Sequence, residues 1–274
     1  MIKHSAKTSM TWAALALAVC LPFSAAQAHR AWMLPSATVL SGQDPWVTVD
    51  AAISNDLFYF EHFPMQLTNL SVTGPDGSPV KAENPSTGRY RSTFDVHLTQ
   101  PGTYKLAVAN NGMFASYKED GKQKRWRGTP EAFAKEVPAN AEGLVVTQTS
   151  GRTEVFVTAG KPSDKALAIT GKGLELAPIT HPNDLVSGDT ANFRFMLDGK
   201  PASNLEVEIV PGGVRYRDQL KDTKTTTDAE GKFSIKWPGP GMYWIEASVK
   251  DDKAAPPAKE RRATYAATFE VLPE

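Results

Sequence analysis

Residues 243–249 read Tyr-Trp-Ile-Glu-Ala-Ser-Val, and this stretch decides the class of fold. Tyr243, Ile245, Ala247 and Val249 occupy every second position, so in an extended chain their side chains lie on one face. A helix cannot place every second residue on one side, because its period is 3.6 residues. The stretch therefore predicts a β-strand with one buried face.

Similar alternation recurs along the chain in short runs separated by Gly, Pro, Asn and Asp. In the first half, Phe94, Val96 and Leu98 form such a run, and Pro101-Gly102 after it predicts a turn. The second half contains five runs, enough for one sandwich of about 100 residues. These runs begin at Phe193, Leu205, Phe233, Tyr243 and Tyr265.

We therefore predict an all-β protein of two tandem antiparallel β-sandwiches, immunoglobulin-like or transthyretin-like, over residues 29–165 and 173–274. A polar, turn-rich segment at 160–165 marks the boundary between them. One short helix is expected as well. Thr129 is its N-cap, Pro130 takes its first position and Pro138 ends it.

The N-terminus has the anatomy of a secretory signal peptide. Lys3 and Lys7 precede an apolar stretch over residues 12–23, and Ala26-Gln27-Ala28 offers a cleavage site. The apolar stretch is shorter than the roughly 20 residues needed to span a bilayer, so we expect no membrane span. The sequence predicts a leader over residues 1–28, cleavage after Ala28 and a periplasmic protein. The alternative is a lipoprotein that begins at Cys20, although Val19 stands where a small residue is usual.

Composition excludes several classes of function. Thirty Lys and Arg balance thirty Asp and Glu, so the chain lacks the basic surplus of a nucleic-acid binder. Its single cysteine lies in the predicted leader, which leaves no disulfide or thiol nucleophile, and no Gly-x-Ser-x-Gly motif occurs. We therefore predict a protein that is not an enzyme and has no catalytic residues.

Cleavage after Ala28 would make His29 the first residue of the exported chain. Its α-amine and its imidazole could then close a chelate ring on one metal ion. An α-amine has a reference pKa of about 8, against about 10.4 for lysine, so a metal displaces its proton more easily near neutral pH. The alternative is that His29 follows the cleavage site by chance.

Three other residues are candidate metal ligands. His62 follows Glu61 in an aromatic segment, where an imidazole beside a carboxylate could form the wall of a site or pack as an ordinary buried histidine. His97 alternates with apolar residues and is expected on the solvent face of a strand. Whether His181 takes part stays open. Imidazole suits nickel, cobalt, copper and zinc, so a divalent transition metal is the expected cofactor.

Several motifs together resemble a bacterial periplasmic family known as a domain of unknown function, whose members are often labelled the periplasmic component of a nickel or cobalt uptake system. They are Ala28-His29-Arg30-Ala31-Trp32 at the processing site, Gly199-Lys200-Pro201, the run over residues 227–233, and Pro240-Gly241-Met242-Tyr243. The start of the mature chain is also similar to copper-resistance carriers whose first histidine binds copper. The resemblance implies a periplasmic protein that handles metal.

Two functions follow as hypotheses. The first is a binding or accessory protein for nickel, cobalt or copper, linked to metal uptake or buffering, with a membrane transporter as a partner and with His29, His62, Glu61 and His97 as candidate ligands. The second is a metal-free interaction module that docks to an outer-membrane receptor or a surface ligand. A third, an oxidase using copper bound by two histidines, would produce peroxide in the presence of a reductant.

Overall fold

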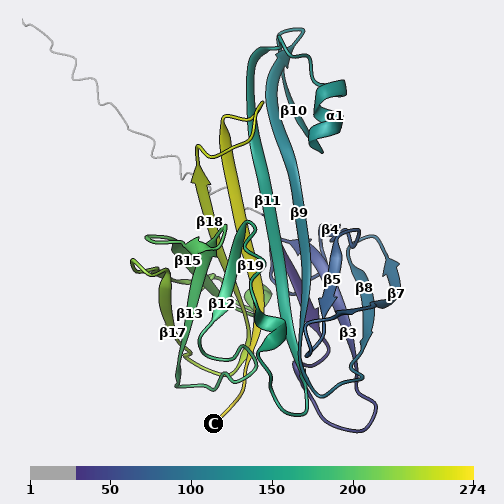
Figure 1. The fold of residues 1–274 in the computed structure, drawn as a ribbon, viewed down its shortest axis with the longest axis vertical. Helices are drawn as coiled ribbons and strands as arrows, with labels where there is room; N and C mark the ends of the chain where they lie inside the picture. The colour runs from purple at the N-terminus through teal and green to yellow at the C-terminus, as the bar shows by residue number, and fades with distance from the viewer. Residues whose placement is uncertain (1–28) are drawn as a thin grey trace, which may run out of the picture.

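A computed structural model describes residues 29–274, and within them strands dominate. The prediction of an all-β fold is confirmed, and the strands form three sheets that pack face to face (Figure 1). The predicted leader, including Cys20 and Ala28, lies outside the described residues.

The first sheet is built from the N-terminal part of the chain. Its strand order is β1-β3-β8-β7, with the short strand β4 pairing to β3. The strands are β1 (Arg30–Pro35), β3 (Trp46–Ser54), β4 (Phe63–Pro64), β7 (Glu83–Thr87) and β8 (Ser92–His97).

The second sheet has ten strands and draws on both halves of the chain. Its order is β16-β15-β18-β19-β11-β9-β5-β6, with β10 added to β9 and β2 added to β11. The strands are β2 (Val39–Leu40), β5 (Leu70–Thr73), β6 (Pro79–Val80), β9 (Gly102–Glu119), β10 (Lys122–Gly128), β11 (Glu142–Ala159), β15 (Glu206–Pro211), β16 (Thr223–Thr226), β18 (Gly241–Asp251) and β19 (Glu260–Val271).

The third sheet belongs to the C-terminal part. In it β13 pairs with β12, β14 and β17. The strands are β12 (Leu174–Pro178), β13 (Thr190–Leu197), β14 (Lys200–Pro201) and β17 (Lys232–Lys236). Two 3-10 turns, η1 (Lys165–Leu167) and η2 (Val214–Tyr216), lie in connections between strands.

The ten-stranded sheet contributes side chains to cores on both of its faces. In β11, Val155 and Val157 pack into the core shared with the first sheet, while Phe156 packs into the core shared with the third. This follows from the period of two, since neighbouring residues of a strand point to opposite faces. The predicted run at Phe94, Val96 and Leu98 lies in the first of these cores.

The two halves are joined by a pairing that the sequence does not suggest. Strand β19 runs parallel to β11, with Thr147 opposite Glu260 at one end and Val155 opposite Thr268 at the other. The predicted sandwiches over 29–165 and 173–274 therefore share one continuous sheet. Antiparallel pairing was the expectation, because local hairpins produce it; the parallel pair joins segments far apart in the chain.

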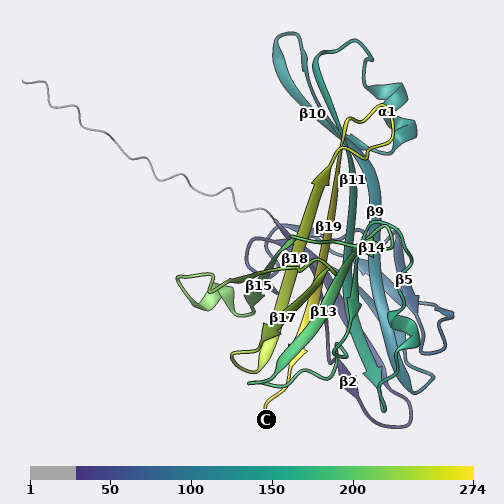
Figure 2. The same cartoon turned by 60° about the vertical axis from the view of Figure 1, so that its left-hand side comes forward.

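The far ends of β9 and β11 project beyond the body as an arm with β10 and α1 (Pro130–Glu136) (Figures 1 and 2). The predicted helix is confirmed, since the Thr129 hydroxyl accepts a hydrogen bond from the Ala132 amide and Pro130 begins the helix. A small separate core that includes Met113, Tyr117 and Phe133 supports the arm. Among residues 29–274, no helix is long and apolar enough to cross a membrane.

Candidate metal centre

The register of the first sheet brings His29 and His62 together. Arg30 pairs with Ser54 at the end of β3, and Phe63 pairs with Ile53 after the chain has looped out and returned. His29 and His62 thus lie just outside paired positions at the same end of the sheet. Their ring centroids are 4.4 Å apart and the rings are inclined at 86°. Two of the four predicted ligand residues therefore meet, although they are far apart in sequence.

The imidazole of His62 has an unused nitrogen. Its Nε2 is buried and has no hydrogen-bond partner among residues 29–274. An unpaired buried polar atom costs about 1–3 kcal/mol in proteins, so its presence calls for an explanation. His29 is exposed at the surface, and the ring of Phe63, 58% exposed, flanks the pair. The ring that carries this nitrogen therefore lies beside an imidazole that can be reached from solvent.

Glu61 positions the loop that carries His62. Its Oε1 accepts hydrogen bonds from the backbone amides of Asn55 at 2.8 Å and Asp56 at 2.9 Å. This carboxylate oxygen thus accepts hydrogen bonds from the first two backbone amides after the end of β3. The other carboxylate oxygen is left for other partners, so Glu61 has a structural role here whether or not it binds metal.

Two hydrogen bonds fix the start of the loop that follows β3. The indole of Trp32, fully buried, donates to the Ser54 hydroxyl at 2.8 Å, and that hydroxyl donates to the Asp56 carbonyl at 2.6 Å. The residues that hold the site, Trp32 and Ser54, were not anticipated from the sequence. Trp32 belongs to one of the motifs that carry the family resemblance, but its hydrogen bond to Ser54 depends on tertiary structure.

Charged side chains surround the residue that follows His29. The Arg30 guanidinium donates to the Asn55 carbonyl at 3.2 Å and lies 3.4 Å from the Glu208 carboxylate. Glu246 faces Glu208 across β15 and β18. Burial raises the pKa of Glu246, the Glu208 charge raises it further, and Arg262 and Arg30 act in the opposite direction. Arg30 therefore anchors the start of β1 to the ten-stranded sheet.

His97 lies at the other end of β3. It pairs with Trp46, the first residue of β3, whereas the pair at His29 adjoins Ser54, the last. Nine strand residues at about 3.4 Å rise put the two ends about 27 Å apart. The structure therefore does not bring His97 to His29 and His62. Its ring stacks on Trp46, with centroids 4.2 Å apart, and its Nε2 lies 2.5 Å from Asp44.

His181 uses both ring nitrogens within the fold. Its Nε2 is 2.9 Å from the Thr103 hydroxyl, and its Nδ1 accepts from the Asn183 amide at 3.1 Å. Burial lowers the pKa of His181, while the Ser163 backbone and the charges of Asp164 and Asp184 act in the opposite direction. Both ring nitrogens of His181 are thus engaged with neighbouring groups of the fold.

Side chains alone do not complete a metal site. Within residues 29–274, no group of three or more His, Cys, Asp or Glu side chains is arranged to hold a metal ion. The two imidazoles supply two donors, and a third donor must come from elsewhere. If the chain is cleaved after Ala28, the α-amine of His29 is the nearest available nitrogen, because it belongs to the same residue.

Comparison with known proteins adds a family and two distant structures. The family described as Domain of unknown function (DUF4198) matches residues 26–251. No curated protein matches the sequence. The D0-D1 domain of Intimin has 12% identity and a TM-score of 0.23, covering 88% of this chain and 97% of its own. The D00-D0 domain of Intimin has 8% identity and a TM-score of 0.22, covering 89% and 100%.

Proposed function

The chain belongs to the DUF4198 family, whose function is unknown, and we propose from its own residues that it binds a divalent transition-metal ion through His29 and His62. The ion would be nickel, cobalt or copper. The protein would work in the periplasm as a non-enzymatic carrier or accessory protein in metal uptake or buffering, as the resemblance noted above implies.

The observation that supports this proposal most strongly is the relation of the two imidazole rings. Metal–nitrogen bonds to histidine are about 2.0–2.1 Å long, so two imidazoles that bind one ion must lie next to each other. The rings of His29 and His62 are 4.4 Å apart and inclined at 86°. The two rings therefore lie edge to face in one pair, and rotation of the side chains would be needed to turn a nitrogen of each toward a shared ion.

The donor set also suits these metals. The α-amine and imidazole of a first-residue His29 would form a chelate, and the buried nitrogen of His62 would add a third donor. Neutral nitrogen ligands favour copper, nickel, cobalt and zinc over calcium or magnesium, which prefer oxygen. The buried position of the His62 nitrogen then acquires a reason, because metal binding would satisfy it.

Calorimetry on protein that begins at His29 tests the proposal. We expect one ion of nickel, cobalt or copper per chain to bind, and His62→Ala to weaken binding at least a hundredfold. The matched control is His97→Ala, which removes an imidazole at the opposite end of β3 and should bind like the wild type. Weak binding that is equal in all three proteins would contradict the proposal.

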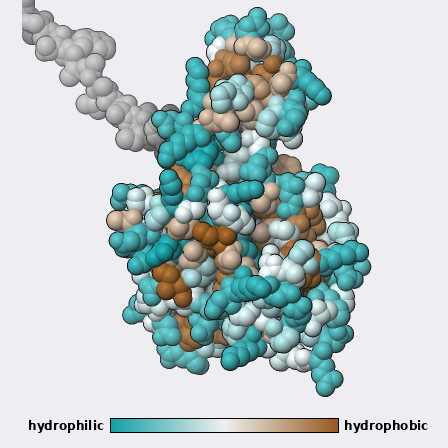
Figure 3. Space-filling view, in the orientation of Figure 1, coloured by the Kyte–Doolittle hydropathy of each residue, from teal (hydrophilic) through white to brown (hydrophobic). Residues whose placement is uncertain are grey.

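A second function is supported by the arm. Strand β10 pairs only with β9 among the described strands, and it carries Lys122, Lys124, Arg125 and Arg127. In Figure 3 apolar surface also gathers on this projecting region. An exposed edge with basic side chains can bind an acidic partner by adding a strand. The protein would then be an interaction module for an outer-membrane receptor or a surface ligand, with no need for metal.

The two functions are separable by experiment. Binding to outer-membrane fractions in the presence of a chelator, lost in Arg125→Glu with Arg127→Glu but kept in Lys200→Glu, would support the interaction module. Lys200 lies on β14, outside the arm. If no chelator-resistant binding is found, or if all variants bind alike, the arm is not a docking element.

A further inference from the structure

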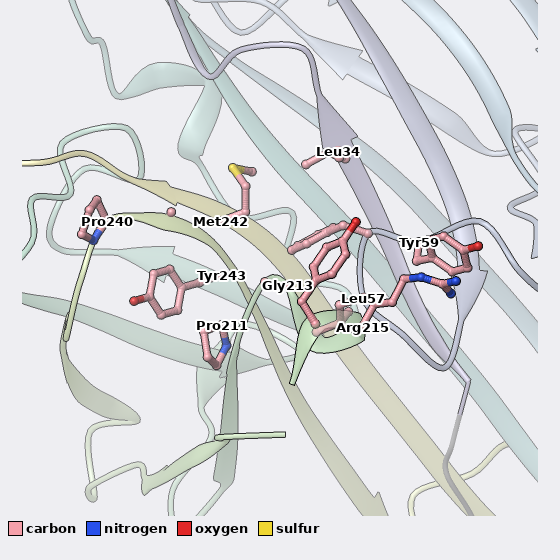
Figure 4. A pocket seen from close by; sticks show the side chains of 13 residues that line it. Leu34, Leu57, Tyr59, Pro211, Gly213, Arg215, Pro240, Met242 and Tyr243 are labelled. Atoms are coloured by element: carbon pink, nitrogen blue, oxygen red, sulfur yellow. The ribbon is translucent and has the colours of Figure 1, made fainter. Parts of the chain in front are cut away.

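A cavity of about 380 Å³ lies where the loop after β3 meets the C-terminal part of the chain (Figure 4). On one side it is lined by Leu34 of β1 and by residues 57–59. On the other it is lined by residues 211–213, 215–216 and 240–243. Its volume falls within the range of about 300–1,000 Å³ that is usual for small-molecule sites. Neither His29 nor His62 lines it, so this cavity is distinct from the metal centre proposed above.

One wall is a loop held in a fixed shape by a single arginine. The Arg217 guanidinium donates hydrogen bonds to the carbonyls of Pro211, Gly212, Gln219 and Leu220. These bonds tie the beginning and the end of the loop to one rigid group. The residues between them, which include Arg215 and Tyr216, are therefore presented on a preformed support.

The opposite wall fits closely against this loop. A Cβ added at Gly212 would meet the Met242 carbonyl at 3.0 Å and the Phe58 ring at 3.2 Å, so a side chain here would force these groups apart. Phe58 itself has a φ of 62°, a conformation that costs a non-glycine residue free energy. Such strain persists where the surroundings hold it, and it is often found at binding sites.

The lining combines flat apolar faces with one positive charge. Pro211, Pro240 and the ring of Tyr243 line the cavity, and the Tyr243 hydroxyl is turned to the Gly239 carbonyl at 2.8 Å. Tyr216, 87% exposed, lines the cavity at its solvent side. Arg215 is the charged residue of the lining.

Arg215 is held in place but its charge is not neutralised. Its guanidinium carbon lies 3.8 Å from the centroid of the Tyr59 ring, and Figure 4 shows the two side chains together at the cavity. It forms no ion pair with the carboxylates of residues 29–274. A guanidinium stacked on a ring keeps its N–H groups free at the edge, where they can bind a carboxylate through two hydrogen bonds.

We propose that this cavity binds a small aromatic carboxylate. The ring of the ligand would lie among the Pro and Tyr faces, and its carboxylate would pair with the edge of Arg215. A sugar fits less well, because it needs several polar side chains, whereas this lining is mostly apolar. A dianion would leave one negative charge without a partner, since the lining carries a single cation.

The test uses 2-naphthoate as the probe and 2-naphthamide as its uncharged match, with metal removed by a chelator throughout. We expect saturable binding of 2-naphthoate by calorimetry, at least tenfold weaker in Arg215→Gln and in Tyr216→Ala. The matched control is Arg89→Gln, because Arg89 also lies over a tyrosine ring, at Tyr90, but outside the cavity. This variant should bind like the wild type.

Three results would overturn the proposal: no saturable binding of 2-naphthoate, equal binding of the carboxylate and the amide, or equal binding by Arg215→Gln and the wild type. Near-ultraviolet circular dichroism establishes that each variant is folded before its binding is interpreted. Arg215 is exposed, so its substitution should leave the core intact. Because metal is absent from the assay, failure here leaves the proposed metal centre unaffected.

Discussion

A histidine lies next to an aromatic residue at each end of strand β3, but the two imidazoles differ in their hydrogen bonding. At the Trp46 end, His97 stacks on the indole and its Nε2 lies 2.5 Å from the Asp44 carboxylate. At the Ser54 end, the Nε2 of His62 is buried without a partner among residues 29–274, and the neighbouring ring is another imidazole. The Nε2 of His97 therefore has a hydrogen-bond partner, and the Nε2 of His62 has none among residues 29–274.

The difference shows that histidine content alone says little about metal binding. At the Trp46 end the Nε2 of His97 is engaged by Asp44, and the neighbouring ring is an indole, which is not a metal ligand. At the Ser54 end, a fixed loop holds the His62 ring 4.4 Å from another imidazole ring. Burial of its unpaired nitrogen is unfavourable, and coordination of a metal ion would offset that free energy. The proposed metal centre therefore depends on the Ser54 end alone.

The largest expected effect comes from blocking the α-amine of His29. N-terminal acetylation of a chain that begins at His29 keeps both imidazoles but turns this amine into an amide, and it adds no new amine. We expect its affinity for copper or nickel to fall about a hundredfold, or about 2.8 kcal/mol at 1.4 kcal/mol per factor of ten. Calorimetry on both chain forms measures this, and equal affinities would show that the amine is not a donor.

The second prediction concerns Glu61, which holds the loop at the Ser54 end. Glu61→Ala leaves the amides of Asn55 and Asp56 without their acceptor and should lower the free energy of unfolding by about 1–3 kcal/mol. Glu61→Gln keeps an acceptor oxygen and should lose less. Urea denaturation gives both values. If Glu61→Gln is as stable as the wild type yet binds metal far more weakly, Glu61 is a ligand and not only a support.

A third prediction uses His181 as another histidine whose nitrogens are engaged. Burial lowers the pKa of His181 in the folded protein, so the unfolded chain takes up a proton first as the pH falls. The stability from this residue is present above its ordinary pKa of about 6.5 and is lost as the pH falls from there through the folded-state pKa. Denaturation at pH 7.5 and 5.5 should show a smaller loss in His181→Gln. An identical loss in both proteins would assign the pH dependence to other groups.

The smallest effect is expected at the Trp46 end. The pair of His97 and Asp44 is largely exposed, and exposed ion pairs contribute about 0–1 kcal/mol. His97→Ala should therefore lower the free energy of unfolding by about 1 kcal/mol or less and leave metal affinity unchanged. A clear loss of metal affinity in this variant would remove the distinction between the two ends of β3.

The all-β fold and the short helix were predictable because both depend on local patterns. The alternation at residues 243–249 and the capping residues at Thr129 and Pro130 act within one strand or one turn. The parallel pairing of β11 with β19 was not predictable in this way, because it joins distant segments and leaves no mark on the period of either strand.

The candidate centre was predictable in part. His29 and His62 were singled out by their chemistry and neighbours, but their approach depends on the register of β1, β3 and β4, which one sequence does not give. The same register separates His97 from them. The cavity at Arg215 and Tyr216 was missed, because the two lie in a turn whose shape depends on Arg217 and on contact with Phe58. The positions of Gly212 and Gly213 were the only local sign of that turn.

The central claim is that His29 and His62 bind one metal ion together. Electron paramagnetic resonance of the copper(II) form, prepared from protein that begins at His29, counts the nitrogen donors directly. We predict three nitrogens in the wild type and in His97→Ala, and two in His62→Ala. A spectrum that is the same in the wild type and in His62→Ala would contradict the claim.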